Sequence, residues 1–179
     1  MSDFDVTIED HSDEILRELE EQKGTILKTW GVQGVSCVQE EIGKKIPRRA
    51  DSWYTSKGGA GLRGSISFQI KEDEDAVYIG SNSEIAYFNE LGTGKYHDSS
   101  DGKSGRQGWW VFVPGSSEHR IGGGKIYTEA EARQIVAILR SKGLDAHMTQ
   151  GIPPIHMIKD GIENNVDEFK GIMENVLKK

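Results

Sequence analysis

Apolar residues near the N-terminus recur at intervals of three or four positions, which is the periodicity of an amphipathic helix. Gly31 and Gly34 divide this stretch into two apolar sets, and a glycine in a helix interior costs about 1 kcal/mol relative to alanine. The pattern therefore predicts two helices or one kinked helix, capped by Ser12 and ending near Pro47. The apolar positions are Ile15, Leu19, Ile26 and Trp30 in the first set and Val35, Val38, Ile42 and Ile46 in the second.

The C-terminal part of the chain shows the same periodicity. Pro153 and Pro154 precede a stripe of apolar residues at intervals of three or four, and proline is well tolerated in the first turn of a helix. The pattern predicts one long helix that starts at the two prolines and continues for about six turns. The stripe consists of Ile155, Ile158, Ile162, Val166, Phe169, Ile172 or Met173, and Val176.

The middle of the chain has the alternation of a sheet. Apolar and polar side chains alternate over residues 65–71, which predicts a strand with one buried face and one solvated face. A charged turn at 71–75 and a return strand at 76–80 complete a hairpin. Residues 109–113 are strongly apolar and predict a further strand.

A short helix is predicted directly after the hairpin. Apolar residues follow at helical spacing, and either Asn82 or Ser83 can cap the start of this helix. Gly92 ends it, because glycine readily takes the left-handed conformation at a helix C-terminus. The apolar residues at this spacing are Ile85, Phe88 and Leu91.

Residues 125–150 form a compact helix–strand unit in the sequence. Thr128 and Glu131 have the spacing of a capping box, and Gly143 is placed to end the helix. Alternating apolar residues from Leu144 onward then predict a strand.

Together these elements predict an α+β fold in a single domain that spans residues 1–179. We expect a small, mostly antiparallel sheet of about four strands, packed by the N-terminal helix pair and by the long C-terminal helix. Residues 1–11 are acidic and are expected to be flexible.

Composition narrows the class of protein. The chain has 22 Lys and Arg against 29 Asp and Glu, a formal net charge of −7, so it lacks the basic balance that nonspecific nucleic-acid binding needs. Cys37 is the only cysteine, which excludes an intrachain disulfide and a multi-cysteine metal site. The sequence shows neither a signal-peptide pattern nor an apolar run long enough for a membrane helix. A soluble protein made in the cytoplasm is expected.

No group of residues in the sequence converges on catalysis or cofactor binding. The glycines of 59–64 fit the pattern G-x-G-x-x-G, but a strand follows them where a dinucleotide site needs a helix. A metal site at His97, Asp98 and Asp101 is the weaker alternative to solvated loop residues. Glu90 lacks an acid–base partner and is better interpreted as a helix-end carboxylate that bonds loop amides or a neighbouring subunit. We therefore expect no enzyme, no cofactor and no metal site.

Trp109 and Trp110 are the best indication in the residues themselves that the chain assembles. Adjacent residues of a strand face opposite ways, so one ring can fill the core. The other has to be covered by the helix of 125–150, by a partner or by solvent. An exposed tryptophan at an edge is a frequent interface anchor.

Three pieces of the sequence, in this order, resemble the small tail-completion or neck proteins of tailed bacteriophages and related prophages. Those proteins carry a TGxLRxSI strand start, then VYIGTNxxYAxxxExGTG, then a PPxPFLRPA lead into a C-terminal helix. Here Ala60 replaces the threonine of the first motif, and residues 156–160 replace the Phe-Leu-Arg-Pro-Ala of the third. The matching residues are Gly61, Leu62, Arg63, Ser65, Ile66, Tyr78, Ile79, Gly80, Asn82, Ala86, Tyr87, Glu90, Gly92, Thr93, Gly94, Pro153 and Pro154.

The resemblance implies a structural virion protein of the neck or tail, assembled in the cytoplasm of a bacterial host. Such proteins form a ring at the head-proximal end of the tail and join it to the head connector. The implied partners are further copies of the chain with six-fold or twelve-fold symmetry, and the neighbouring tail-tube or terminator and head-connector proteins. Relative to shorter family members, the unit at 125–150 is an insertion. The candidate interface residues are Glu90, Gly92, Thr93, Gly94, Trp109, Trp110, Pro153 and Pro154.

In a ring of this kind DNA passes through a channel without being bound. The acidic balance fits such a channel, and its lining is expected at Asp98, Asp101 or Glu118. No contact with a membrane is expected.

Two other classes of protein stay open. A small hydrolase encoded with phage genes is one, and the missing acid–base constellation argues against it. A soluble module that binds a host protein through the C-terminal helix is the other. The module predicts a stable monomer with one partner, whereas a neck protein self-associates.

Overall fold

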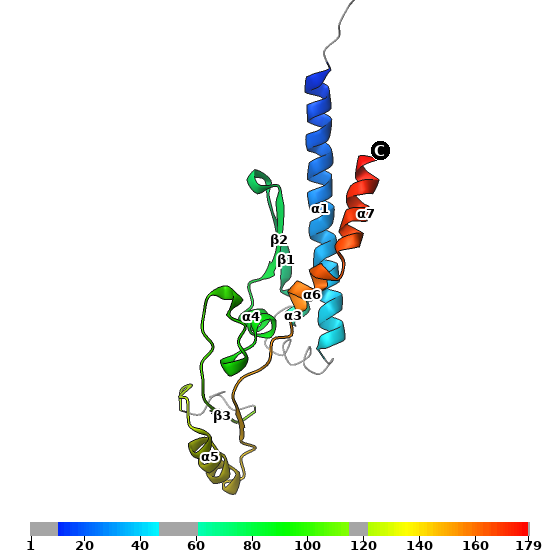
Figure 1. Cartoon of the computed structure of the whole chain (residues 1–179). Coiled ribbons are helices and arrows are strands. Elements are labelled where there is room, and N and C mark those ends of the chain that lie inside the picture. The colour runs from blue at the N-terminus through cyan, green and yellow to red at the C-terminus, as the bar shows by residue number, and fades with distance from the viewer. Residues whose placement is uncertain (1–10, 47–60, 115–121, 179) are drawn as a thin grey trace, which may run out of the picture.

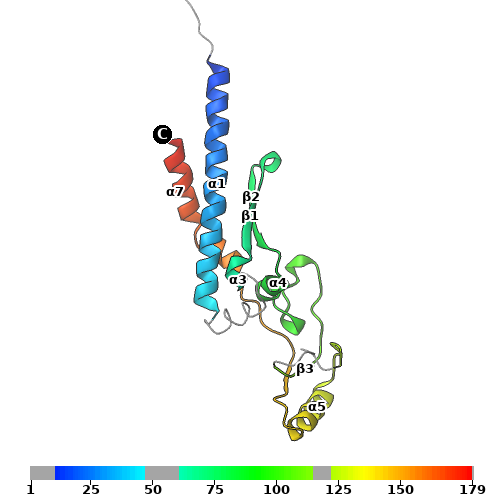
Figure 2. The same cartoon turned by 180° about the vertical axis from the view of Figure 1, so that it is seen from behind.

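The computed structural model describes residues 11–46, 61–114 and 122–178, which form an elongated molecule of mixed helices and sheets (Figure 1). The elements in chain order are α1 (Ser12–Lys45), α3 (Gly61–Gly64), β1 (Ile66–Lys71), η1 (Glu72–Glu74), β2 (Ala76–Ser81), α4 (Glu84–Leu91), η2 (Gly94–Tyr96), η3 (Ser99–Asp101), β3 (Trp110–Phe112), α5 (Glu129–Ser141), β4 (His147–Thr149), α6 (Met157–Glu163) and α7 (Val166–Leu177). Helix α1 is the longest element and lies between the β1–β2 hairpin and α7 (Figure 2). A lobe of β3, α5 and β4 lies at the far end of the molecule from the start of α1.

Helix α1 is continuous, so of the two predicted alternatives, two helices or one kinked helix, the pair of helices is wrong. It passes through both glycines, and these are the points where the hairpin packs against it. A Cβ atom at Gly31 would lie 2.2 Å from the ring of Phe68, and one at Gly34 would lie 2.0 Å from Cδ1 of Ile79. The close packing of the hairpin offsets the helix-propensity cost of the two glycines.

The ends of α1 lie close to the predicted positions. His11 is the N-cap, and the predicted cap Ser12 is the first helical residue. The helix ends at Lys45, while Pro47 lies outside the described residues. All of the segment 1–11 except His11 also lies outside them, so its expected flexibility stays a prediction.

The β1–β2 hairpin is confirmed. The two strands pair antiparallel, with Phe68 opposite Ile79, and η1 forms the connection. Asp75 ends this connection in the left-handed conformation with φ 49°. Its carboxylate lies 2.9 Å from the ammonium group of Lys23, which ties the end of the hairpin to α1.

The main core lies where α1, α3, α4 and α6 meet the base of the hairpin. Helix α6 lies close to α1, since a Cβ atom at Gly161 would be 2.9 Å from Cα of Val38. Leu62, from the first motif, is only 2% exposed in this cluster. The buried members are Val38, Ile42, Ile46, Leu62, Ile66, Ala86 and Met157.

The strands of the described residues form two separate two-stranded sheets, so the single sheet of about four strands is not what these residues build. Strand β3 pairs antiparallel with β4, with Val111 opposite Met148. Helix α5 covers this pair and begins with the predicted capping box of Thr128 and Glu131, in which both reciprocal hydrogen bonds form. The lobe buries its own apolar cluster, namely Val111, Val113, Tyr127, Ala132, Val136 and Ala146.

The C-terminal stripe is divided between two helices, so the prediction of one long helix is wrong. Helix α6 ends at Glu163 and α7 starts at Val166, with two asparagines between them. The side chain of Asn165 donates to the carbonyl oxygen of Gly161 at 2.8 Å. Such local side-chain bonds offer the backbone an alternative to the helical ladder, which is why asparagine favours helix ends.

Candidate functional site

Two of the three motif segments lie side by side in the structure. Residues 92–95 run beside residues 150–155, and we call this contact the GTG junction. The amide of Thr93 donates to the carbonyl oxygen of Ile152 at 2.8 Å. In return, the amide of Ile152 donates to the hydroxyl of Thr93 at 3.0 Å. The junction connects the helical body to the lobe.

Glycines allow the two segments of the GTG junction to approach. Gly94 has φ 64°, and a Cβ atom there would lie 1.9 Å from the carbonyl oxygen of Gln150, to which the amide of Lys95 donates at 3.1 Å. Gly151 has φ 134°, and a Cβ atom there would lie 1.9 Å from the carbonyl oxygen of Thr93. The contact therefore requires glycine at both positions.

Glu90 joins the GTG junction to the C-terminal helices. Its Oε2 accepts the amide of Ile158 at 2.7 Å, and its Oε1 accepts the amide of Lys159 at 2.9 Å. These amides belong to the first turn of α6, where backbone N–H groups lack intrahelical acceptors and the helix dipole favours negative charge. The sequence predicted bonds from loop amides, whereas the amides that Glu90 accepts belong to a helix, and contact of Glu90 with a neighbouring subunit stays a prediction.

The sequence predicted that the two prolines start the C-terminal helix, and this prediction is wrong. Pro153 and Pro154 lie in a link without regular secondary structure, and α6 begins at Met157 after the N-cap His156, which has φ 51°. Pro154 packs on Gly92, since a Cβ atom at that glycine would lie 2.8 Å from the proline nitrogen. A proline also disfavours helical backbone at the residue before it, which accounts for the start of α6 beyond the two prolines.

Both tryptophans make contacts within the chain. Trp110 is 9% exposed, and its ring lies 2.5 Å from the position of a Cβ atom at Gly94, so it faces the GTG junction. Trp109 packs against the core of the lobe, and its amide donates to the carbonyl oxygen of Tyr127 at 2.9 Å. The prediction that one ring fills a core is confirmed. A role of either ring at a subunit interface stays a prediction.

A polar network fastens the loop that follows the GTG junction to α4. Nδ1 of His97 lies 3.3 Å from the carbonyl oxygen of Gly92, and Nε2 lies 3.1 Å from Asp101. The hydroxyl of Tyr87 donates to the other oxygen of Asp101 and accepts a hydrogen bond from Nζ of Lys103 at 3.2 Å. The side chains of His97 and Asp101 are only 9% and 16% exposed.

These hydrogen bonds shift two pKa values in opposite directions. The carbonyl of Gly92 and the carboxylate of Asp101 raise the pKa of His97 above its usual 6.5. The hydroxyl of Tyr87 and the amide of Lys103 hold the pKa of Asp101 well below its usual range. The His97 contribution to stability is complete below about pH 6.5 and is lost as the pH rises through the raised pKa. The Asp101 contribution is complete above about pH 4 and is lost as the pH falls through the lowered pKa.

The Asp101→Asn substitution is expected to lower the pKa of His97, because the amide cannot stabilise the imidazolium by charge. The measurement is an NMR titration of the His97 ring, in which the midpoint of the variant should lie below that of the unsubstituted protein. Asp98→Asn is the matched control, since Asp98 accepts the amide of Ser100 at 3.0 Å and influences His97 only through space. An unchanged His97 midpoint in the Asp101→Asn variant would contradict the assigned network.

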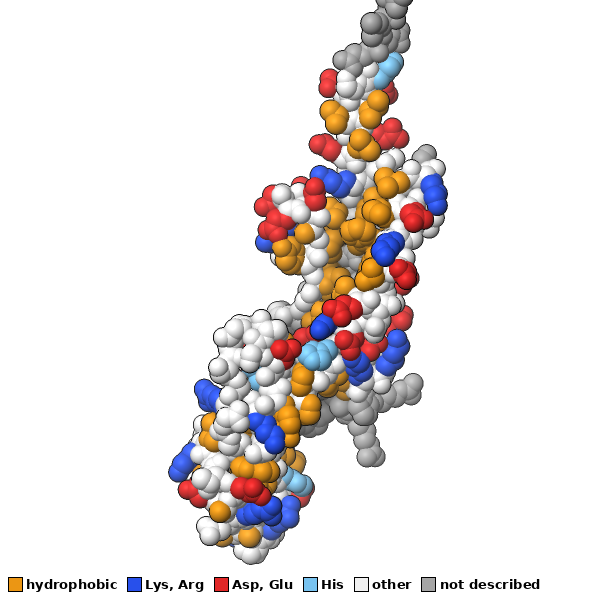
Figure 3. Space-filling model, viewed as in Figure 1, with side chains coloured by type: hydrophobic (Ala, Val, Ile, Leu, Met, Phe, Trp, Pro, Cys, Tyr) orange, Lys and Arg blue, Asp and Glu red, His pale blue; other side chains and the backbone are white. Residues whose placement is uncertain are grey.

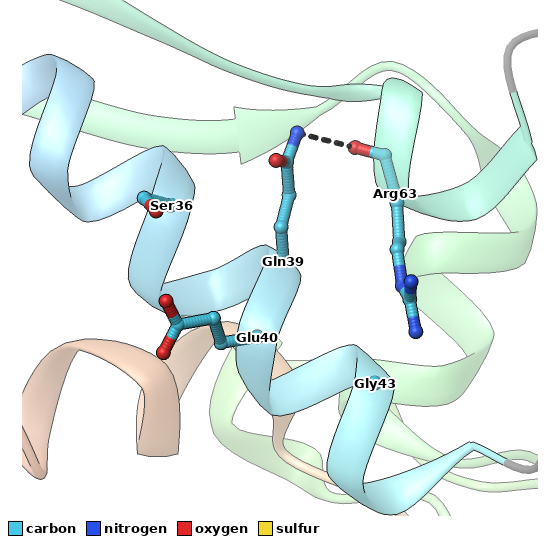
Figure 4. Close-up of a pocket in the computed structure, with 5 residues that line it drawn as sticks. All are labelled: Ser36, Gln39, Glu40, Gly43 and Arg63. Atoms are coloured by element: carbon cyan, nitrogen blue, oxygen red, sulfur yellow. Dashed lines mark hydrogen bonds between the residues drawn. The ribbon is translucent and has the colours of Figure 1, made fainter.

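A hollow of about 250 Å³ lies between α1 and α3 (Figure 4). The side chain of Gln39 donates to the carbonyl oxygen of Arg63 at 3.0 Å. The side chain of Arg63 runs beside α1, and Nη2 lies 2.7 Å from the position of a Cβ atom at Gly43. The carboxylate of Glu40 points away from the side chain of Arg63. The backbone of Arg63 thus ties α3 to α1 and its side chain lies along α1, while Ser36 completes the lining of the hollow.

The alternative metal site does not form. Within the described parts of the chain, no three His, Cys, Asp or Glu side chains gather where they could hold a metal ion. His97 binds Asp101, and Asp98 caps η3. The channel lining expected at Asp98, Asp101 or Glu118 stays a prediction; the side chain of Asp101 is 16% exposed, and Glu118 lies outside the described residues. Across those same residues, no helix is both long and apolar enough to cross a membrane.

Comparisons with protein-family models, with curated proteins and with solved structures find no match to the chain. The site rests on its geometry and on the sequence motifs. Sequence reasoning singled out Tyr87, His97 and Asp101 separately but missed their network with Lys103, because the loop residues His97, Asp101 and Lys103 meet Tyr87 of α4 only when the loop folds back. It also missed Gly151, whose position directly before Ile-Pro-Pro is the only signal in the sequence.

Proposed function

We propose that the chain is a structural virion protein of a tailed phage or prophage, which forms a ring at the head-proximal end of the tail and joins the tail to the head connector. The observation that carries the proposal is that residues of the three motifs make contacts that connect separate elements of the structure. The backbone carbonyl of Arg63 accepts a hydrogen bond from Gln39 of α1, Glu90 caps α6, and the GTG segment pairs with the segment that contains Pro153 and Pro154. Motifs that are distant in the sequence thus support one connected structural unit.

The role proposed is structural and not catalytic. The carboxylate of Glu90 is engaged by two backbone amides, and the side chains of His97 and Asp101 are engaged by each other. These groups hold segments in place, which is the use that a rigid ring subunit makes of polar residues. The lobe that contains residues 125–150 is proposed to be an addition to the part shared with shorter family members.

The elongated shape also favours assembly. Large apolar side chains are exposed at both ends of the molecule, for example Leu16 and Ile138. A small subunit in a ring buries such surfaces against its neighbours through contacts that close by rotation. The proposed partners are further copies with six-fold or twelve-fold symmetry, and the adjoining tail-tube and connector proteins, with DNA only passing through.

Light scattering of the purified protein over a wide concentration range, with negative-stain images of the same fractions, tests the proposal. Closed rings, or a multimer whose mass rises with concentration, are the expected result. A strict monomer at every concentration would contradict the proposed self-assembly and would favour the soluble binding module.

A further inference from the structure

The first turns of α1 present apolar side chains to solvent. We call residues 12–22 the open end of the molecule. Ile15, Leu16 and Leu19 in this segment are 56%, 59% and 51% exposed. In Figure 3 the apolar surface runs from this end down between the hairpin and α7. A helix end this exposed gains little from packing within one chain, and most helix stability in proteins comes from packing.

The open end is strongly acidic. Five carboxylates surround its apolar side chains, against a single basic side chain, Arg17. The hairpin end, tied to α1 by the pair of Lys23 and Asp75, adds further acidic side chains nearby. Two open ends would repel each other, which disfavours a symmetric pairing of this surface with itself. The carboxylates are Asp13, Glu14, Glu18, Glu20 and Glu21 at the open end and Glu72, Asp73 and Glu74 on the hairpin.

The lobe presents the opposite combination. Ile138 and Leu144 are 55% and 43% exposed at the C-terminal end of α5, and Arg140 and Lys142 lie between them in the chain. We call these four residues the basic lobe face. The carboxylates of α5 and of the following turn have partners within the lobe, namely Glu129 with Arg133, Glu131 with Thr128, and Asp145, whose side chain is 78% exposed, with His147. Arg140 donates from Nε to the carbonyl oxygen of Ala146 at 2.9 Å and keeps its charge at the surface with Lys142.

We propose that the open end of one copy binds the basic lobe face of the next copy. This inference rests on the proposed ring and assigns its contact surfaces. The two surfaces lie at opposite ends of the elongated molecule, so they cannot meet within one chain (Figures 1 and 2). Each joins exposed apolar side chains to one sign of charge, and the signs are complementary. A contact between unlike surfaces is heterologous, and it closes into a ring when the rotation between copies closes.

Two blocked variants test the proposal. Leu16→Asp with Leu19→Asp blocks the open end, and Ile138→Asp with Lys142→Glu blocks the lobe face. All four side chains are on the surface, so circular dichroism should show an unchanged fold. Each variant alone is expected to be a monomer at concentrations where the unsubstituted chain assembles, with association weakened at least tenfold. An equimolar mixture should form a dimer and stop there, because it holds only one pair of intact complementary surfaces.

The control is Val32→Asp, which adds the same charge at a 58% exposed position of α1 outside both surfaces. It should assemble like the unsubstituted chain, and the assembly should weaken as salt is raised. Normal assembly of either blocked variant alone, or a mixture that grows beyond a dimer, would overturn this inference and leave the proposed ring standing on another surface. A chain that never self-associates would overturn both.

Discussion

Replacing Gly94 by alanine is expected to lower the free energy of unfolding by about 3 kcal/mol or more, because two costs add. The residue has φ 64°, a conformation that costs a side chain roughly 1–2 kcal/mol. The new Cβ atom would also lie 1.9 Å from the carbonyl oxygen of Gln150, a backbone atom that cannot turn away. The two segments of the GTG junction would have to separate, with loss of the hydrogen bond from Lys95 to Gln150.

The measurement is urea unfolding followed by tryptophan fluorescence, to which Trp110, whose ring lies against Gly94, contributes together with the other three tryptophans. Gly102→Ala is the matched control. That glycine has a similar φ of 75°, but nothing lies within 4 Å of a Cβ atom there, so only the conformational cost applies. Equal destabilisation in the two variants would show that the close approach at the GTG junction is not rigid.

Local sequence patterns were sufficient to predict those elements that are defined by a few neighbouring residues. The capping box of Thr128 and Glu131 and the alternation of the hairpin are found in the structure, and Gly92 ends α4 with a positive φ of 73°, although its ψ of −175° is extended and not left-handed helical. In each case the residues that define the element also make the contacts that stabilise it. The α+β class follows from these elements.

The wrong predictions concern helices whose continuity depends on contacts with residues distant in the sequence. Gly31 and Gly34 weaken a helix in isolation, yet α1 is continuous because Phe68 and Ile79 pack where side chains would be. Conversely, Ile162 and Val166 keep a four-residue interval across the break between α6 and α7, so periodicity alone hides the break. Nothing lies within 4 Å of a Cβ atom at Gly24, and no contact explains that glycine.

The candidate site shows the same difference between local patterns, which the sequence reveals, and distant contacts, which it does not. Its residues were identified from their types and order, but their partners were not. Glu90 accepts amides 68 and 69 residues further along the chain, a pairing that no spacing rule contains. The GTG junction is therefore a tertiary feature, built from residues that were identified separately.

Replacing Lys45 by methionine is expected to lower the free energy of unfolding by about 1–3 kcal/mol, because the substitution removes the donor to the carbonyl oxygen of Ile155 and the cation that Asp160 and the buried Glu41 share. Nζ of Lys45 donates to the carbonyl oxygen of Ile155 at 2.8 Å, forms an ion pair with Asp160 and lies 3.4 Å from Glu41, whose side chain is 10% exposed. The ammonium group thus joins the last turn of α1 to the start of α6. The measurement is the shift of the urea midpoint at neutral pH.

Lys44→Met is the control within the same turn. Lys44 also approaches Glu41, at 3.3 Å, but its side chain is 67% exposed, so its removal should change stability by less than about 0.5 kcal/mol. The hydrogen bond from Lys45 lowers the pKa of Asp160, so the pair stabilises the fold above about pH 4 and loses its effect as the pH falls through the lowered value. The stability gap between the unsubstituted chain and Lys45→Met should therefore narrow in acid. A gap that stays constant on acidification, or equal losses for Lys44→Met and Lys45→Met, would contradict the assignment of Lys45 as the link between α1 and α6.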